Sequence, residues 1–156
     1  MAHHAPHAPD TPVREFVAER TVRFDDCDPA GIVFYPRYFY MINGVVEDWW
    51  HHIGQPWRDL IMSRRLVTPV SHLDTVFLRP SMMGDVLRCH LSVEAVSRSS
   101  FRLRHRIVGA DGLERFRLRQ RMVCASLDQM QPISWPADIK AVLTQWATPS
   151  TPATKA

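Results

Sequence analysis

The longest regular pattern of apolar positions follows Pro36 and has the period of an α-helix. Apolar residues recur there at steps of three and four, at Tyr38, Ile42, Val45, Trp49 and Ile53. Neighbouring positions widen this stripe, so the helix is apolar over much of its circumference. The spacing predicts a helix that begins at Pro36, with Tyr35 as its cap, and runs to about Ile53. A shorter helix over 57–65 follows Gly54.

Most of the remaining chain alternates between apolar and polar positions, which is the period of a β-strand. We expect strands over residues 16–24, 67–70 leading into 72–78, 86–96, 101–108 and 113–127. Short turns join the later strands, and short connections favour antiparallel neighbours. A final helix is expected over 136–146. This order predicts an α+β fold in which one curved antiparallel sheet wraps around one long helix.

Length and composition indicate a single domain. The chain has 156 residues, of which 46% are apolar and 22% charged, which is ordinary for a globular protein. Residues 1–14 hold few large apolar side chains and several prolines and histidines, so we expect a disordered arm there. The domain itself is expected over 15–147, with a disordered tail over 148–156.

Several features limit the location and the chemistry. No run of 18 apolar residues is present, and no apolar signal segment lies near the first residues. The cysteines, Cys27, Cys89 and Cys124, are odd in number and far apart, which favours neither a disulfide framework nor a zinc site. We therefore expect a cytoplasmic protein with no metal, no cofactor and no membrane partner.

The net charge is +3, and arginines between residues 98 and 121 supply much of the positive charge. They alternate with core residues, at Arg98, Arg102, Arg104, Arg106, Arg115, Arg117, Arg119 and Arg121. The simple interpretation is a solvated strand face. A second interpretation is a binding surface for an anionic ligand such as a phosphorylated cofactor. No nucleic-acid recognition motif accompanies the arginines, so no nucleic-acid partner is expected.

The segment from Phe24 to Pro36 carries the most distinctive chemistry. It places three carboxylates, Asp25, Asp26 and Asp28, between a predicted strand and the start of the long helix. The first N–H groups of a helix lack intrahelical partners and lie at its positive end. A carboxylate in this turn could attack or hydrate a carbonyl group while the helix start stabilises the oxyanion.

This segment, from Asp26 to Pro36 and followed by Tyr38, resembles the signature of the 4-hydroxybenzoyl-CoA thioesterase family, which has the hot-dog fold. Weaker similarity continues through 54–58, 67–70, 99–101 and 136–138, so the resemblance covers roughly Arg20 to Trp146. It implies hydrolysis of an acyl-CoA thioester, with an aromatic acyl group such as 4-hydroxybenzoyl or benzoyl.

The resemblance also implies roles for individual residues. Asp28 matches the catalytic carboxylate, and the backbone N–H of Tyr35 is expected to polarise the thioester carbonyl. Gly31 is expected to border the substrate. Asn43 stands where the 4-hydroxybenzoyl enzyme has an acidic residue that receives the substrate's phenol, so the expected charge is missing. Arg98 is the main match to the CoA-binding turn, which is less basic here.

Other residues compete for these roles. Glu47, on the long helix, is the rival catalytic carboxylate. Asp25 and Asp26 are expected to shape or solvate the loop. Cys27 lacks an identifiable base and is expected to be a small buried group. Strand histidines, His72 and His105, are more often structural.

Alternatives also remain for the mechanism and for the function. Asp28 could act as a nucleophile or as a general base. The chain could act on acyl-carrier-protein thioesters, or bind acyl thioesters without turnover. A single sheet leaves an edge strand and part of the helix uncovered, so we expect a homodimer or homotetramer.

Overall fold

Five strands form one antiparallel sheet, in the order β1-β4-β5-β6-β3, in a computed structural model that describes residues 12–148. The strands are β1 (Glu15–Thr21), β3 (Val70–Phe77), β4 (Val86–Val96), β5 (Ser100–Val108) and β6 (Glu114–Val123). The predicted antiparallel sheet is confirmed. The predicted arm and tail lie largely outside the described residues, so the proposed division of the chain stays a prediction.

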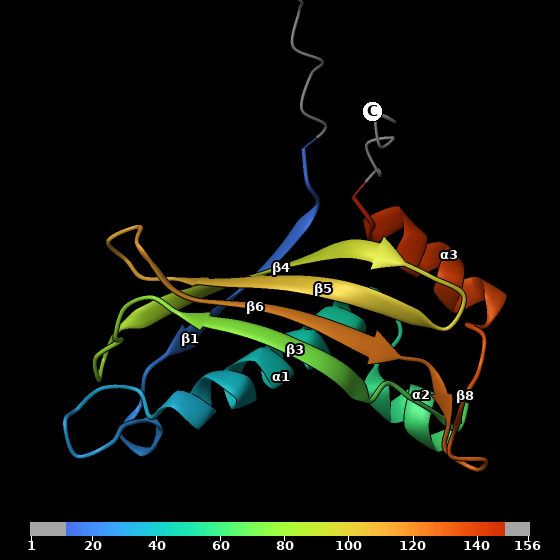
Figure 1. The fold of residues 1–156 in the computed structure, drawn as a ribbon, viewed down its shortest axis with the longest axis horizontal. Helices are drawn as coiled ribbons and strands as arrows, with labels where there is room; N and C mark the ends of the chain where they lie inside the picture. The colour runs from blue at the N-terminus through green and yellow to red at the C-terminus, as the bar shows by residue number, and fades with distance from the viewer. Residues whose placement is uncertain (1–11, 149–156) are drawn as a thin grey trace, which may run out of the picture.

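One long helix, α1 (Tyr35–His52), lies along the concave face of this sheet (Figure 1). The helix cap is Phe34 and Pro36 is the second helical residue, so the predicted cap at Tyr35 is one position too late. Trp49 and Trp50 of α1 are fully buried where the helix packs against the rest of the protein. The remaining helices are α2 (Trp57–Met62), α3 (Ala137–Trp146) and a short 3₁₀ turn η1 (Phe24–Asp26).

A second, small sheet was not predicted. It contains β2 (Leu66–Val67), β7 (Ala125–Ser126) and β8 (Gln131–Pro132), in the order β2-β7-β8. The strand predicted over 113–127 is therefore wrong as one element, because β6 ends at Val123 and β7 pairs with β2 instead of β3. The alternation continues through both strands, so the pattern alone does not show where the partner changes.

The two faces of the main sheet differ in chemistry. The inner face carries buried side chains from the three central strands, among them Leu87, Leu91, Leu103, Ile107, Phe116 and Leu118. Burial raises the pKa of the Cys89 thiol on this face to about 11. The outer face carries the alternating exposed arginines of β5 and β6, such as Arg104 and Arg119. Within residues 12–148, no helix is long and apolar enough to cross a membrane.

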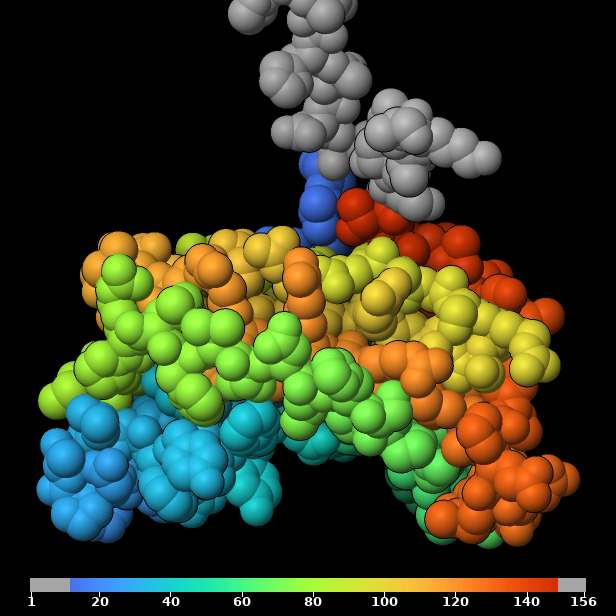
Figure 2. Space-filling model, in the orientation of Figure 1, coloured from blue at the N-terminus to red at the C-terminus, as the bar shows by residue number. Residues whose placement is uncertain are grey.

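Strand β3 is the least covered part of the sheet. Leu73 and Phe77 pair with inner-face residues of β6, yet their exposed fractions are 45% and 51%. Figure 2 shows that the molecule is hollowed beneath this strand, between the start of α1 and the region of α2 and the small sheet. Helix α1 therefore leaves the inner side of this edge strand open.

Candidate active site

The loop between η1 and α1 holds Asp28 through its own backbone. The Asp28 N–H donates to the Ile32 carbonyl at 3.0 Å, and the Gly31 N–H donates to the Asp28 carbonyl at 2.9 Å. The Ala30 N–H donates to Asp28 Oδ1 at 2.8 Å. Asp28 thus makes the turn expected of such an aspartate. This hydrogen bond uses one carboxylate oxygen and fixes the orientation of the group. The second oxygen can therefore take part in catalysis.

The same loop is fastened to the segment that precedes β4. The Val33 N–H donates to the Ser81 carbonyl at 2.9 Å, and the Met83 N–H donates to the Gly31 carbonyl at 3.1 Å. The Tyr38 hydroxyl of α1 bonds the Ser81 hydroxyl at 2.8 Å. These contacts tie the loop, the helix start and the sheet together, so the carboxylate has a defined position.

Gly31 lies at the bend of this loop, with a φ of +75° that favours glycine. Its N–H and its carbonyl are both bonded within the chain. A Cβ at this position would meet nothing within 4 Å, so the space beside it is open. Its contact with substrate stays a prediction.

The first residue of α1 supplies the candidate oxyanion donor. Tyr35 follows the cap residue Phe34, and Pro36 has no N–H. The Arg37 N–H is already bonded to the Phe34 carbonyl at 2.8 Å. Because the first N–H groups of a helix have no intrahelical acceptor, the Tyr35 N–H is available at the positive end of the helix. Pairing of Cys27 with Val33 folds the loop back on itself just before the helix start, where the Phe34 N–H donates to the Asp26 carbonyl at 2.9 Å.

Neighbouring groups support the loop instead of competing with Asp28. The Asp26 carboxylate accepts the Arg23 N–H at 2.8 Å, which shapes the 3₁₀ turn. Desolvation, together with the charges of the neighbouring aspartates, raises the pKa of the Cys27 thiol, which disfavours a thiolate nucleophile. Glu47 lies about 18 Å along α1 from Tyr35, so one chain does not bring it to this loop.

Asn43 occupies a different position, two turns into α1. It borders a cavity of ≈ 200 Å³ between α1 and the edge of the sheet. Gln120 of β6 borders the same cavity from the sheet side, and the other lining residues are apolar. The sequence reasoning missed Gln120, although it interrupts the inner-face series of Phe116, Leu118 and Met122. That interruption was the available signal.

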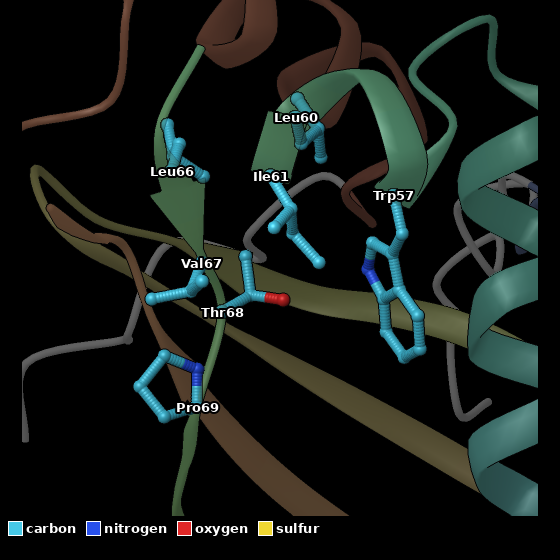
Figure 3. A pocket seen from close by; sticks show the side chains of 7 residues that line it. All are labelled: Trp57, Leu60, Ile61, Leu66, Val67, Thr68 and Pro69. Atoms are coloured by element: carbon cyan, nitrogen blue, oxygen red, sulfur yellow. The ribbon is translucent and has the colours of Figure 1, made fainter. Parts of the chain in front are cut away.

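A second hollow of ≈ 250 Å³ lies between α2 and β2. Figure 3 shows its lining, in which Ile61 lies between Trp57 and the strand residues Leu66 and Val67. None of the predicted site residues borders it. It lies near the end of α1 that is remote from Asp28.

Arg98 is not brought to Asp28 within one chain. The Asp28 loop is bonded to residues just before β4, whereas Arg98 lies two residues beyond the last residue of that strand. An eleven-residue strand spans roughly 35 Å. The Arg98 guanidinium is exposed and donates to the Ser134 hydroxyl at 3.4 Å.

The outer-face arginines largely fit the simple interpretation of a solvated strand face. Arg106 pairs with Glu15 at 3.1 Å and with Glu114 at 3.4 Å, and Arg119 pairs with Glu94 at 3.0 Å. His72 is exposed on β3, whereas His105 is fully buried on β5. The expectation that these histidines are not catalytic in this loop is consistent with their positions.

A curved antiparallel sheet wrapped around one long helix, with a carboxylate turn at the helix start, is the architecture of hot-dog thioester hydrolases. The Thioesterase-like superfamily matches residues 22–143, and this chain belongs to that superfamily. The predicted fold, the predicted family and the predicted class of thioester hydrolase are thereby confirmed.

Named relatives agree with this assignment. The chain is 28% identical over 130 residues to a 1,4-dihydroxy-2-naphthoyl-CoA hydrolase of Acaryochloris marina, covering 82% of this chain and 95% of that protein. It is 30% identical over 96 residues to a 4-hydroxybenzoyl-CoA thioesterase of Pseudomonas, covering 60% of this chain and 68% of that protein. The solved structure of a Pseudomonas 4-hydroxybenzoyl-CoA thioesterase superposes with a TM-score of 0.76 at 28% identity, covering 83% of this chain and 99% of that one. Together these relatives support an acyl-CoA thioesterase.

Proposed function

We propose that this protein hydrolyses an aromatic acyl-CoA thioester, with Asp28 as the catalytic carboxylate and the Tyr35 N–H as the oxyanion donor. The observation that carries the proposal is the loop itself. It orients the Asp28 carboxylate through the Ala30 N–H and leads directly into the start of α1. Such a pair supplies a base or nucleophile together with a preorganised hydrogen-bond donor.

Two routes are compatible with this geometry. In the first, Asp28 removes a proton from water as the water oxygen attacks the thioester carbonyl. In the second, an Asp28 oxygen attacks the carbonyl, and water then hydrolyses the mixed anhydride. In both routes the Tyr35 N–H stabilises the tetrahedral oxyanion, the C–S bond breaks, and the CoA thiolate takes up a proton.

The cavity beside α1 supports an aromatic acyl group. Its volume of ≈ 200 Å³ and its mainly apolar lining suit a flat ring. The relatives are named for hydroxylated aromatic acyl-CoA substrates. We propose that 4-hydroxybenzoyl, benzoyl or dihydroxynaphthoyl groups lie along this side of the helix, with Asn43 near the distal end.

A second copy of the chain would complete the site. Asp28 and Arg98 of the same chain lie roughly a strand length apart. One molecule of acyl-CoA therefore does not reach both. The exposed apolar side chains of β3 and the free edge of that strand offer a surface for a partner. We propose a homodimer, or a homotetramer made of two such dimers, in which Arg98 of one subunit meets the CoA phosphates near Asp28 of the other.

The test is release of free thiol from a panel of aromatic and aliphatic acyl-CoA thioesters. The proposal expects turnover that is fastest with aromatic groups. Presenting the same acyl group on CoA and on a carrier protein separates the two donor alternatives. Faster hydrolysis of the carrier-linked form would contradict the choice of CoA.

A further inference from the structure

A buried polar pair lies in the otherwise apolar inner face of the sheet. His105 of β5 has an exposed fraction of 0%, and Gln120 of β6 has one of 5%. The Gln120 side-chain amide lies 2.9 Å from His105 Nε2, within hydrogen-bond distance. The candidate catalytic loop uses neither residue.

This pair has hydrogen-bonding capacity that the chain does not use. His105 Nδ1 is buried and has no partner among residues 12–148. Burial lowers the pKa of His105 to about 3, so the imidazole is neutral at pH 7. A neutral imidazole and an amide each offer both a donor and an acceptor. Buried polar groups are unfavourable unless they are bonded, so an apolar pair would serve the core better if packing were their only role.

Gln120, but not His105, borders a cavity whose lining contains a second amide. Gln120 borders the ≈ 200 Å³ cavity from the sheet, and Asn43 borders it from α1. The rest of the lining is apolar: Phe39, Ile42, Val46, Val70, Leu73, Leu118 and Met122. A benzene-sized ligand fits an apolar cavity of about 150 Å³. The space therefore suits an aromatic ring whose edge carries a hydrogen-bonding substituent.

This cavity also runs along the same side of α1 as the candidate oxyanion donor. Tyr35, Phe39 and Asn43 are four residues apart, so they share one face of the helix. Phe39 lies about 6 Å and Asn43 about 12 Å along the axis from Tyr35. An acyl group whose carbonyl meets the Tyr35 N–H would extend its distal ring atoms toward the two amides.

We infer that Gln120, held in position by His105, is a specificity-determining hydrogen-bonding residue for a neutral hydroxyl or carbonyl substituent on the distal part of an aromatic acyl group. This inference rests on the proposed thioesterase function. Gln120 contacts the substituent, and His105 acts as a positioning residue through Gln120. Because both side chains are neutral, the subsite favours uncharged substituents over carboxylates.

The experiment compares paired substrates with and without the substituent, 4-hydroxybenzoyl-CoA against benzoyl-CoA and dihydroxynaphthoyl-CoA against naphthoyl-CoA. In Gln120→Leu, kcat/KM for the hydroxylated substrate of at least one pair should fall about tenfold or more relative to wild type. For the substrate without the hydroxyl group, kcat/KM should stay within about threefold of the wild-type value. Met122→Leu is the matched control, because it changes an apolar residue of the same strand and cavity. Met122→Leu should change kcat/KM for the two substrates of a pair by the same factor.

His105 is tested by the same ratio. His105→Leu should lower the preference for the hydroxylated substrate, and His105→Asn should restore part of it, because an amide can again bond Gln120. Circular dichroism shows whether the two His105 variants fold. If neither folds, the inference is tested by Gln120→Leu alone. An unchanged substrate ratio in folded Gln120→Leu, for both pairs, would overturn the inference.

Failure of the proposed function has a different signature. If the wild-type protein releases no thiol from any substrate, calorimetric binding of the same paired acyl-CoAs to wild-type protein and Gln120→Leu decides the inference. Preferential binding of the hydroxylated member by wild-type protein alone would support the subsite. Equal binding of both members by both proteins would overturn it.

Discussion

The two ends of strand β4 carry the two halves of the proposed chemistry, and they are built differently. At its start, backbone hydrogen bonds fasten the Asp28 loop to residues 81–83, and the Tyr38–Ser81 bond ties that segment to the helix. At its end, the Arg98 guanidinium makes one long bond of 3.4 Å to Ser134 and is otherwise open to solvent. One end is preorganised, and the other is free to adapt to a ligand.

This difference matches the demands of the two tasks. A group that stabilises a transition state gains from a fixed position. A cation that meets a phosphate at the protein surface needs only proximity and charge. Because one strand length separates the two ends, the comparison also predicts that one substrate is served by two chains.

The largest expected effect is at the preorganised end. Asp28→Asn should lower kcat by about 10² to 10⁴-fold, because the amide neither accepts the proton nor attacks the carbonyl. The variant should still bind substrate. Steady-state thiol release measures this effect, with Asp25→Asn, a neighbouring carboxylate, as the matched control. Near-wild-type turnover in Asp28→Asn together with inactive Glu47→Gln would transfer the role to Glu47.

Mixing two defective variants tests whether the ends cooperate between chains. Asp28→Asn and Arg98→Glu are each expected to have low thioesterase activity at substrate concentrations below KM. After unfolding and refolding together in equal amounts, about a quarter of the wild-type activity should return if they form dimers randomly, since half the dimers then hold one intact shared site. Activity equal to the mean of the two separate variants would show that each site lies within one chain.

The buried histidine between the two ends predicts a pH effect on stability. The folded pKa of about 3 lies below the ordinary 6.5, so the unfolded chain binds a proton that the folded chain does not. Stability should therefore fall as the pH drops from about 6.5 toward 3. Lowering the pH from 7 to 5 should therefore reduce the free energy of unfolding by about 2 kcal/mol through His105 alone.

Urea unfolding at those two pH values measures the contribution of His105. In His105→Leu the pH-dependent part assigned to this residue should disappear, although the variant can be less stable at both values. The same pH dependence in the variant and in the wild-type protein would show that His105 is protonated in the folded state or that other groups dominate.

A smaller effect is expected at the adaptable end. Arg98→Ala should raise KM for acyl-CoA about three- to tenfold with little change in kcat, which is the result of losing uniform binding. The difference from wild type should shrink at high salt, because ions screen an exposed charge pair. Arg88→Ala, on the outer face, provides a control. An unchanged KM at low salt would remove Arg98 from the site.

The smallest effect concerns the helix side of the cavity. Asn43→Asp should raise kcat/KM for 4-hydroxybenzoyl-CoA relative to benzoyl-CoA by a few-fold, because a carboxylate accepts the phenol proton more strongly than an amide. Measurement of both substrates with one enzyme preparation gives the ratio directly. If the ratio does not change, Asn43 serves packing or solvation.

Much of the fold could be predicted because its signals are local. The helical stripe through Tyr38 and Trp49, and the alternation in 86–96, gave α1 and β4 nearly residue by residue. The split of 113–127 into β6 and β7 could not be predicted, because alternation reports which face a residue occupies and not which strand it pairs with.

The candidate site divides in the same way. The Asp28 turn was visible because its residues are consecutive in the chain. Gln120 and Asn43 border one cavity but lie far apart in sequence, so only the fold shows their relation. The separation of Asp28 from Arg98 likewise needs the direction of β4, which the sequence alone does not supply.

The most direct measurement is the steady-state rate of thiol release from 4-hydroxybenzoyl-CoA and 1,4-dihydroxy-2-naphthoyl-CoA by the wild-type protein. The proposed mechanism predicts catalytic turnover of at least one of these substrates, with kcat/KM of about 10⁴ M⁻¹ s⁻¹ or more. Saturable binding of both substrates with thiol release no faster than spontaneous hydrolysis would contradict it, and would make the protein a binder of acyl thioesters.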